Sequence, residues 1–238
     1  MGRREPWVLP SGGAYRWPKP IRTPVSALNA ALPLPEELQS SRVVVVSDFN
    51  CPYCFTLNEW LTSLGVASQV YWVGVEHKPH LPSRVLDVNR EEDRSTLNSE
   101  VNDVQRRAPE VGVQLPAVWL NSQRALLLQA AVETEEPQRA PALRTAIFRR
   151  FWQAGRNIAA PEELEGCLRE AELDPAEDRF LDPQQLGRIT GWWAQALDRI
   201  PCMLAPSGAR HLGLQDRRAV EAFVMGALHE PPPGPSCR

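Results

Sequence analysis

The side chains of this sequence best suited to chemistry are two cysteines, which lie in the run Cys51-Pro52-Tyr53-Cys54. Four consecutive valines at 43–46 come before the pair, and apolar residues at helical spacing come after it. A continuous apolar run of this length is typical of a strand covered on both faces of a sheet. The pattern therefore predicts a buried strand, a short turn that carries the dithiol, and a helix that opens on the second thiol.

The predicted helix gives the first cysteine a reason to react. Unpaired N–H groups and the positive end of the macrodipole stabilise a thiolate at a helix N-terminus. A thiolate on Cys51 can attack a disulfide, and Cys54 can then resolve the mixed disulfide. Gly65 is the expected end of the helix. Its apolar face is expected to contain Phe55, Leu57, Trp60, Leu61 and Leu64.

A zinc site and a pair of inert buried thiols are the two alternatives for the cysteine pair. His77 and His80 are more closely spaced than zinc-binding histidines usually are, and Pro79 lies between them. The sequence contains no second CxxC that could complete a metal site. The residues therefore favour a redox centre without a metal, and inert thiols remain an alternative.

Length and composition describe an ordinary globular protein. The chain has 238 residues, of which 43% are hydrophobic, and this is enough for a sizeable core. Its formal net charge is -3, with lysine and arginine scattered, so no basic face for nucleic acid is expected. No run approaches the roughly 18 apolar residues that cross a bilayer, and the first residues lack the apolar core of a secretion signal. We therefore expect a cytoplasmic protein that binds no membrane.

The five cysteines fit a reducing compartment. An odd number favours reduced, catalytic or incidental thiols over a framework of structural disulfides. Cys167, in a predicted helix, and Cys237, near the end of the sequence, are interpreted as incidental.

The remaining segments predict a second strand, a block of helices and a return to strands. Residues 68–76 are rich in β-branched and aromatic side chains and are expected to form a parallel strand beside the first. Strands are expected again at 200–205 and up to residue 214, followed by a helix from Asp216. Between them, apolar spacing and capping residues predict helices at 91–108, after Asn121 or Ser122, at 143–152, from Pro161 and from Asp182.

This order defines an α/β chain with a thioredoxin-like fold, β-α-β and then β-β-α, split by a large helical insertion. The thioredoxin-like domain is expected at 42–76 and 199–230, and the insertion domain at 77–198. Residues 1–41 are interpreted as a proline-rich N-terminal extension, and residues 231–238 as a disordered tail.

Ile200-Pro201-Cys202 is the second motif with a role near the dithiol. In a thioredoxin-like fold, a cis-proline opens the strand that faces the dithiol and leaves the preceding backbone free to pair with a bound peptide or thiol tripeptide. An ordinary trans-proline at a strand start is the alternative. Cys202 is then either a third thiol close to Cys51 and Cys54 or a small buried hydrophobe.

Gln215-Asp216-Arg217 begins the last predicted helix, with Asp216 as its N-cap. The same helix end could hold a carboxylate while Asp216 takes an ammonium group, which together match the α-amino acid end of glutathione. A positive charge near the dithiol could come from the segment after the second strand, which carries His77, Lys78, His80 and Arg84. A solvated loop explains these four residues equally well.

Together these residues resemble the DsbA-like branch of the thioredoxin superfamily. The subgroup is that of cytosolic DsbA-type oxidoreductases, 2-hydroxychromene-2-carboxylate isomerases and kappa-class glutathione transferases. The resemblance covers roughly residues 43–228. It implies that Cys51 is the nucleophile, Cys54 the resolving thiol and Pro201 the cis-proline. It also implies that Ile200 is the backbone partner of glutathione or peptide, and that Gln215 and Asp216 are γ-glutamyl contacts. The most specific pieces are Phe49 to Cys54; Asn121-Ser122 with Arg124-Ala125; Ile147-Phe148 with Gly155 and Asn157-Ile158; Ile200-Pro201; and Gln215-Asp216-Arg217.

The sequence departs from this subgroup in ways that favour redox chemistry. The isomerases and transferases that this sequence resembles have a serine at the position of Cys51. A cysteine at that position would form a mixed disulfide with glutathione. Leu214 stands where the subgroup usually has glycine, and Cys202 replaces a threonine or small residue. The Pro-Tyr dipeptide is typical of glutaredoxins, whose potentials lie at about -200 to -230 mV. Because Tyr53 cannot be cationic, we expect a weaker oxidant than periplasmic DsbA.

The sequence therefore predicts a cytosolic DsbA-like thiol-disulfide oxidoreductase with a CPYC dithiol. Pro52 and Tyr53 are expected to contact the substrate, and glutathione is the expected co-substrate, with no permanently bound cofactor. A disulfide-containing protein or small molecule is the expected partner, and pairing of two chains is left open. Two alternatives remain: a glutathione-dependent isomerase or transferase, and a redox-inert binding module.

Overall fold

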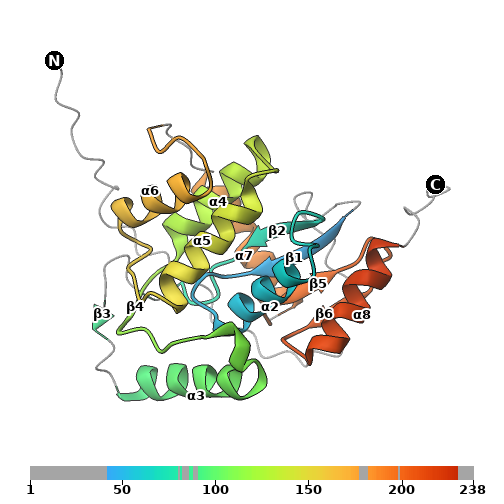
Figure 1. Cartoon of the computed structure of the whole chain (residues 1–238), viewed down its shortest axis with the longest axis horizontal. Helices are drawn as coiled ribbons and strands as arrows, with labels where there is room; N and C mark the ends of the chain where they lie inside the picture. The colour runs from blue at the N-terminus through green and yellow to red at the C-terminus, as the bar shows by residue number, and fades with distance from the viewer. Residues whose placement is uncertain are drawn as a thin grey trace.

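The computed structural model describes residues 42–79, 81, 86–87, 91–176, 182–197 and 199–229 (Figure 1). The expected N-terminal extension at 1–41 and the expected tail at 231–238 lie outside these ranges. His80, Arg84 and Cys237 also lie outside the described residues.

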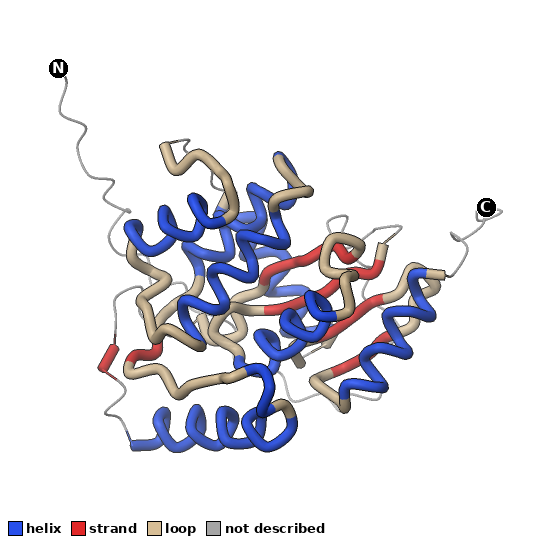
Figure 2. Tube along the Cα trace, viewed as in Figure 1, coloured by secondary structure: helices blue, strands red, loops and turns tan. Residues whose placement is uncertain are grey.

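Four strands form a mixed central sheet in the order β2-β1-β5-β6 (Figure 2). β1 pairs parallel with β2 and antiparallel with β5, and β5 pairs antiparallel with β6. The predicted thioredoxin-like fold is confirmed, because a β-α-β unit and a β-β-α unit meet in one sheet. The strands are β1 (Val43–Ser47), β2 (Val70–Gly74), β5 (Cys202–Leu204) and β6 (Arg210–Leu212).

Helices cover the sheet and fill the stretch of chain between β2 and β5. In the view of Figure 1, α2 and α8 lie in front of the sheet and α7 lies behind it. The helices are α2 (Pro52–Ser63), α3 (Glu91–Arg107), α4 (Gln123–Glu135), α5 (Ala140–Trp152), α6 (Pro161–Glu170), α7 (Pro183–Ala196) and α8 (Arg217–Leu228).

The valine run forms an interior strand with every residue buried, as predicted. Val43 and Val45 belong to the core cluster that contains the apolar residues of α2, α5 and α8. Val44 and Val46 belong to a second cluster, with Trp193 of α7. Successive side chains of a strand point to opposite faces, so a strand of four valines is stable only where helices cover both faces.

The helix after the dithiol begins earlier than predicted. α2 starts at Pro52, so Cys51 is its N-cap residue and Cys54 lies inside the first turn. A proline in the first helical position lacks only an N–H that would be unpaired anyway, which is why it starts the helix. At the other end, Gly65 follows the C-cap residue Leu64 and adopts a positive φ of 72°.

The helices α4, α7 and α8 begin at the residues predicted to cap them. At α4 the two candidate caps, Asn121 and Ser122, have different roles. Asp182 and Asp216 each accept a backbone N–H of their own helix at 2.9 Å. At α4, Asn121 accepts the N–H of the first helical residue at 2.7 Å. Ser122 takes the N-cap position but makes no capping hydrogen bond, and its hydroxyl is used elsewhere.

Three short elements were not predicted. β3 (Leu86–Asp87) pairs antiparallel with β4 (Val118–Trp119), and a 3-10 turn, η2 (Pro109–Val111), follows α3. Strands of two residues are too short to show an alternating pattern, so the sequence carries no signal for them.

Arg144 joins α5 to α4 through a buried ion pair and to α2, which carries the dithiol, through a hydrogen bond. The Arg144 guanidinium donates to Glu133 at 2.9 Å, to Asn58 of α2 at 2.9 Å and to the carbonyl of Ala67 at 3.1 Å. Arg144 is 1% exposed, and removing one partner of such a buried pair typically costs about 3–5 kcal/mol. The position of α2 therefore depends on this arginine.

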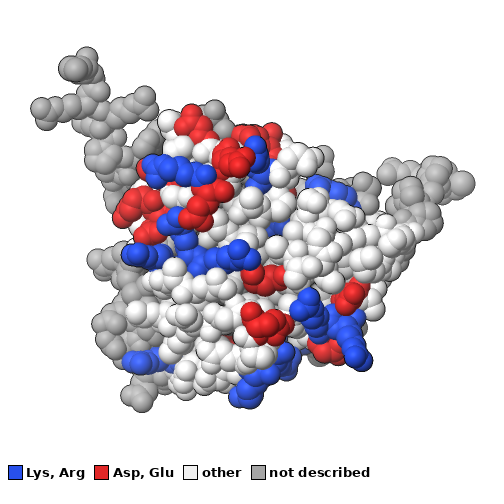
Figure 3. All heavy atoms as spheres, viewed as in Figure 1, with Lys and Arg blue, Asp and Glu red and all other residues white. Residues whose placement is uncertain are grey.

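Charges of both signs are interspersed on the face shown in Figure 3, where acidic and basic side chains meet over α5 and α6. Arg149 pairs with Glu59 at 2.8 Å, and Arg150 pairs with Glu163 at 2.8 Å. Among the helices described, none is both long enough and apolar enough to cross a membrane.

Candidate active site

The predicted dithiol lies at the N-terminus of α2 beneath the surface. Cys51 is 4% exposed and Cys54 is 1% exposed, and both are free thiols. The Cys51 side chain is hydrogen-bonded to Cys54, so the two sulfur atoms are neighbours. This arrangement places the two thiols where a disulfide between them requires little movement.

The thiolate expected on Cys51 does not form readily in this environment. Burial raises the pKa of Cys51 well above its usual value, and the hydrogen bond and charge of Cys54 raise it further. Glu100 of α3 raises it as well. Burial therefore opposes the expected thiolate. The hydrogen bond from the backbone N–H of Cys54 lowers the pKa, as expected of a helix N-terminus, but it is a smaller effect than burial.

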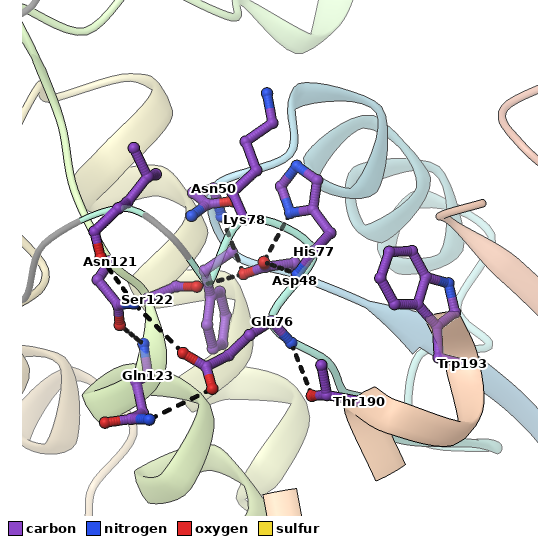
Figure 4. A network of polar contacts seen from close by, with 12 residues as sticks. Asp48, Asn50, Glu76, His77, Lys78, Asn121, Ser122, Gln123, Thr190 and Trp193 are labelled. Atoms are coloured by element: carbon purple, nitrogen blue, oxygen red, sulfur yellow. Dashed lines mark hydrogen bonds and ion pairs between the residues drawn. The ribbon is translucent and has the colours of Figure 1, made fainter. Parts of the chain in front are cut away.

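Asp48 anchors the turn that leads to the dithiol. Its side chain is fully buried and accepts hydrogen bonds from the Ser122 hydroxyl and from the backbone N–H of Asn50. The backbone N–H and Nδ1 of His77 also reach this carboxylate, at 3.0 and 2.6 Å (Figure 4). Its carbonyl accepts the N–H of Cys51 at 3.3 Å. One carboxylate thus holds the ends of β1 and β2 and the start of α4 around the nucleophile.

Glu76 extends this network to α7. Its carboxylate accepts hydrogen bonds from Asn121 and Gln123, both at 3.2 Å. Its backbone N–H donates to the Thr190 hydroxyl of α7 at 3.1 Å (Figure 4). Burial and the charge of Asp48 raise the pKa of Glu76, and the two amide donors oppose that rise. The network orders the end of β2 from two sides.

Of the four basic residues expected near the dithiol, the two that the structure describes, His77 and Lys78, have other partners. His77 is joined to Asp48, and Lys78 lies 3.9 Å from Glu100 with its Nζ 3.8 Å from the centre of the Trp119 ring. Among the described residues, no three His, Cys, Asp or Glu side chains are grouped in a way that could hold a metal ion.

Tyr53, between the two cysteines, contacts α3. Its hydroxyl donates to Asp103 at 3.2 Å, and burial together with the charge of Asp103 raises its pKa to about 12. α3 therefore lies along the dithiol and supplies two carboxylates, Glu100 and Asp103, to its surroundings.

The Ile200–Pro201 peptide bond is cis, as predicted. The Pro201 carbonyl accepts the N–H of Gly213 at 2.8 Å, and the Arg199 carbonyl accepts the Trp193 indole N–H at 3.1 Å. Ile200 packs against both core clusters. Residues 199–201 are thus held in place at the start of β5. Their contact with a substrate stays a prediction.

Cys202 does not join the dithiol. It is fully buried in the cluster of Val44, Val46 and Trp193, on the α7 face of the sheet, whereas Cys51 and Cys54 belong to the cluster on the α2 face. Burial raises the pKa of Cys202 to about 12. The third-thiol interpretation is corrected, because the alternation of β5 turns Cys202 to one face and Met203 to the other. Cys202 is a small buried hydrophobe.

Gln215 and Asp216 are exposed at the start of α8. The neighbouring Arg217 donates a hydrogen bond to Ser63 at 2.7 Å. Ser63 is the last residue of α2, at the opposite end of that helix from the dithiol. Among the described residues, no hydrogen bond joins Gln215 or Asp216 directly to the dithiol. The γ-glutamyl role of both residues therefore stays a prediction.

Several residues of the site were missed by sequence reasoning. Asp48 carried a usable signal, since a charged residue that directly follows four buried valines needs a buried partner. Glu76, Glu100 and Asp103 carried none, because their importance lies in contacts with residues far away in the sequence.

A CxxC at the N-terminus of the helix after the central strand β1, together with a cis-proline just before β5, the antiparallel neighbour of β1, defines a thioredoxin-like protein. Comparison with protein families specifies the class: the chain belongs to the family of the DSBA-like thioredoxin domain, whose family model matches residues 42–186, more than half of the chain. The comparison with curated proteins found no match.

Solved structures share the fold at low sequence identity. A putative protein disulfide isomerase from Nitrosomonas europaea is 15% identical with a TM-score of 0.61, covering 77% of this chain and 95% of that one. A probable DsbA oxidoreductase from Streptomyces coelicolor is 15% identical with a TM-score of 0.56, covering 82% and 92%. A 2-hydroxychromene-2-carboxylate isomerase is 16% identical with a TM-score of 0.52, covering 78% and 95%.

Proposed function

We propose that this protein is a thiol-disulfide oxidoreductase in which Cys51 and Cys54 cycle between dithiol and disulfide. The observation that carries the proposal is the placement of two free, buried thiols at the start of α2, one at its N-cap and the other in its first turn. Two free cysteines that are neighbours at this place of a DsbA-like fold have the geometry for disulfide exchange.

The reaction balances with a disulfide as the oxidant. The Cys51 thiolate attacks one sulfur of the substrate, forms a mixed disulfide and releases the other half as a thiolate that takes up a proton. Cys54 loses its proton and attacks the Cys51 sulfur, which closes the internal disulfide and releases the second half. Two molecules of glutathione then restore the dithiol and leave as glutathione disulfide.

Glutathione is the reductant that we propose, because the Pro-Tyr dipeptide resembles that of glutaredoxins, whose potentials lie near the cytosolic glutathione pool. This coupling places the proposed reaction in the cytoplasm. Ile200, beside the cis-proline, is the proposed backbone contact, and Gln215 with Asp216 are the proposed γ-glutamyl contacts. The high pKa of Cys51 implies slow attack at neutral pH, since little thiolate is present.

The test is a redox titration of the full chain in buffers of reduced and oxidised glutathione. Acid quenching, alkylation and peptide mass measurement give the fraction of Cys51–Cys54 disulfide. We expect a midpoint of about -200 to -230 mV, the glutaredoxin range. A dithiol that stays reduced at every glutathione ratio would overturn the proposal and leave a redox-inert binding module.

The Cys51→Ser variant separates this function from the isomerase or transferase alternative. For an oxidoreductase, the variant forms no disulfide and has no turnover with glutathione disulfide. Retention of glutathione binding together with turnover of a chromene carboxylate by the same variant would favour the isomerase instead.

A further inference from the structure

Tyr53 is the one residue of the CPYC turn whose side chain reaches another helix through a hydrogen bond in the described structure. Its hydroxyl donates to Oδ2 of Asp103 at 3.2 Å, across 50 positions of sequence. The ring packs partly buried against the core cluster that contains both thiols. The turn is therefore fastened to α3 at a point between the two cysteines.

The same oxygen of Asp103 has a second partner, Arg107, which connects it to the loop before α8. Nε of Arg107, one turn along α3, lies 3.0 Å from Oδ2. Nη1 of Arg107 donates to the carbonyl of Leu214 at 3.1 Å, in the loop before α8. One carboxylate and one guanidinium thus connect the CPYC turn, α3 and the loop that leads to Gln215.

We propose that Asp103 and Arg107 are positioning residues of the dithiol, which hold Tyr53 and the loop before α8 in place and so set the reactivity of Cys51. The proposal deepens the redox function proposed above and rests on it. Neither residue touches the reacting sulfur atoms, and both act through Tyr53.

An ordinary surface ion pair does not account for this arrangement. Exposed pairs four residues apart on one helix contribute little. Glu165 and Arg169 on α6 are such a pair, joined only to each other among the described residues. The Glu165 side chain is 47% exposed, but that of Asp103 is 25% exposed. Asp103 also accepts from a buried part of the active-site turn, which Glu165 does not.

The contacts around the dithiol predict the sign of the effect. Of the two α3 carboxylates, Glu100 adds to the rise in the Cys51 pKa that burial causes, and Lys78 lies 3.9 Å from Glu100. Asp103 is joined to Tyr53, to Arg107 and to Arg106, whose Nη2 lies 3.0 Å from Oδ1. Asp103 therefore acts on Cys51 through the Tyr53 hydrogen bond. Without the Asp103 carboxylate the turn is held less firmly, and Cys51, which is 4% exposed, becomes easier to reach.

The experiment measures alkylation of Cys51 by iodoacetamide against pH, with each thiol followed by peptide mass. Iodoacetamide is uncharged, so substitutions that change charge do not alter its approach. Asp103→Asn should alkylate Cys51 about threefold faster than wild type at pH 8, the size expected for one hydrogen bond. Arg107→Gln should raise the rate by a smaller factor, because Arg106 still pairs with Asp103. Glu165→Gln should leave the rate unchanged.

A double-mutant cycle tests the route through Tyr53. In the Tyr53→Phe background, Asp103→Asn should have no further effect on the rate. With Tyr53 present, Asp103→Glu keeps the carboxylate and should give a rate between those of wild type and Asp103→Asn. Thermal unfolding of each variant shows whether it is folded, and Arg107→Gln supplies the same comparison if Asp103→Asn folds poorly. Equal effects of Asp103→Asn with and without the Tyr53 hydroxyl, or no effect at all, would overturn the proposal.

The glutathione titration of the same proteins separates the two proposals. If the wild type forms no disulfide but the alkylation profiles shift as expected, the redox function fails and the positioning role stands. If the titration succeeds and the profiles coincide, the positioning role fails alone.

Discussion

Cys51 and Cys202 are buried thiols on opposite faces of the same sheet, 4% and 0% exposed, and burial raises the pKa of both. Their neighbours differ. Cys202 lies among apolar side chains and its sulfur has a weak contact only with a backbone carbonyl among the described residues, at 3.8 Å. Cys51 has a second thiol beside it and follows a turn held by hydrogen bonds.

This comparison shows that burial and cysteine chemistry alone do not mark a redox centre. Both faces exclude water, but only the α2 face combines a partner thiol, a helix N-terminus and polar anchors on three elements. On the α7 face, the same side chain fills space between valines and a tryptophan. The function therefore depends on what organises the thiol.

The largest difference between the two faces should appear in catalysis. Cys51→Ala should lower turnover with glutathione disulfide by about a thousandfold or more, because it removes the nucleophile. Cys202→Ala should keep turnover within about twofold and cost about 1 kcal/mol of unfolding free energy, the price of a small core truncation. Steady-state kinetics and urea unfolding measure the two effects. A large loss of turnover in Cys202→Ala alone would reverse the comparison.

The anchors of the α2 face should be visible in stability. Asp48→Asn replaces one of the two carboxylate oxygens by an NH2 group, so at least one of the donors that contact Asp48 loses its acceptor. The unfolding free energy should therefore fall by about 2–3 kcal/mol. Ser122→Ala removes one donor from the same network and should cost about 1 kcal/mol. Urea unfolding compares the three proteins. An Asp48→Asn variant as stable as wild type would show that the network does not hold the turn.

The smallest effect concerns the coupling between the two thiols of the α2 face. Because the pKa of Cys51 is raised, its alkylation rate should still increase above about pH 9, where an ordinary exposed thiol levels off. Cys54→Ala removes a hydrogen bond and a charge that, after burial, raise this pKa, so alkylation of Cys51 at pH 8 should be several-fold faster. Alkylation of Cys202 in the same samples should not change.

The same shift has a consequence for stability. The folded state favours the protonated Cys51 thiol, so its contribution is present below the ordinary cysteine pKa and is lost as the pH rises through the folded pKa. Urea unfolding should therefore show a loss of stability above about pH 9 that is smaller in Cys54→Ala. An identical alkaline loss in both proteins would contradict the coupling of the two thiols.

Local patterns predicted the elements that carry the dithiol. Four valines indicated a strand buried on both faces, and the apolar spacing after Cys54 indicated the helix, because these signals depend only on neighbouring residues. The start of the helix at Pro52 was not predicted. The cis form of Ile200–Pro201 followed from the resemblance to a family rather than from spacing.

What surrounds the dithiol could not be predicted in this way. The Ser122–Asp48 and Tyr53–Asp103 hydrogen bonds join residues 74 and 50 positions apart, and single-sequence patterns contain no information on such pairs. The face to which Cys202 points depends on the register of β5 against β1, which pairs Cys202 with Val46. Cys51 is buried in a core cluster that includes residues of α3 and α5, which lie far from it in the sequence. Its raised pKa therefore could not be predicted from the sequence either.

The central claim is that Cys51 exchanges disulfides and Cys54 completes the exchange. The most direct test is the intact mass of Cys54→Ser after incubation with glutathione disulfide, followed by peptide mapping. The account predicts the addition of one glutathione at Cys51, removable by reductant, and none when Cys51→Ser is combined with it. A protein that gains no glutathione, or gains it only at Cys202 or Cys167, would contradict the account.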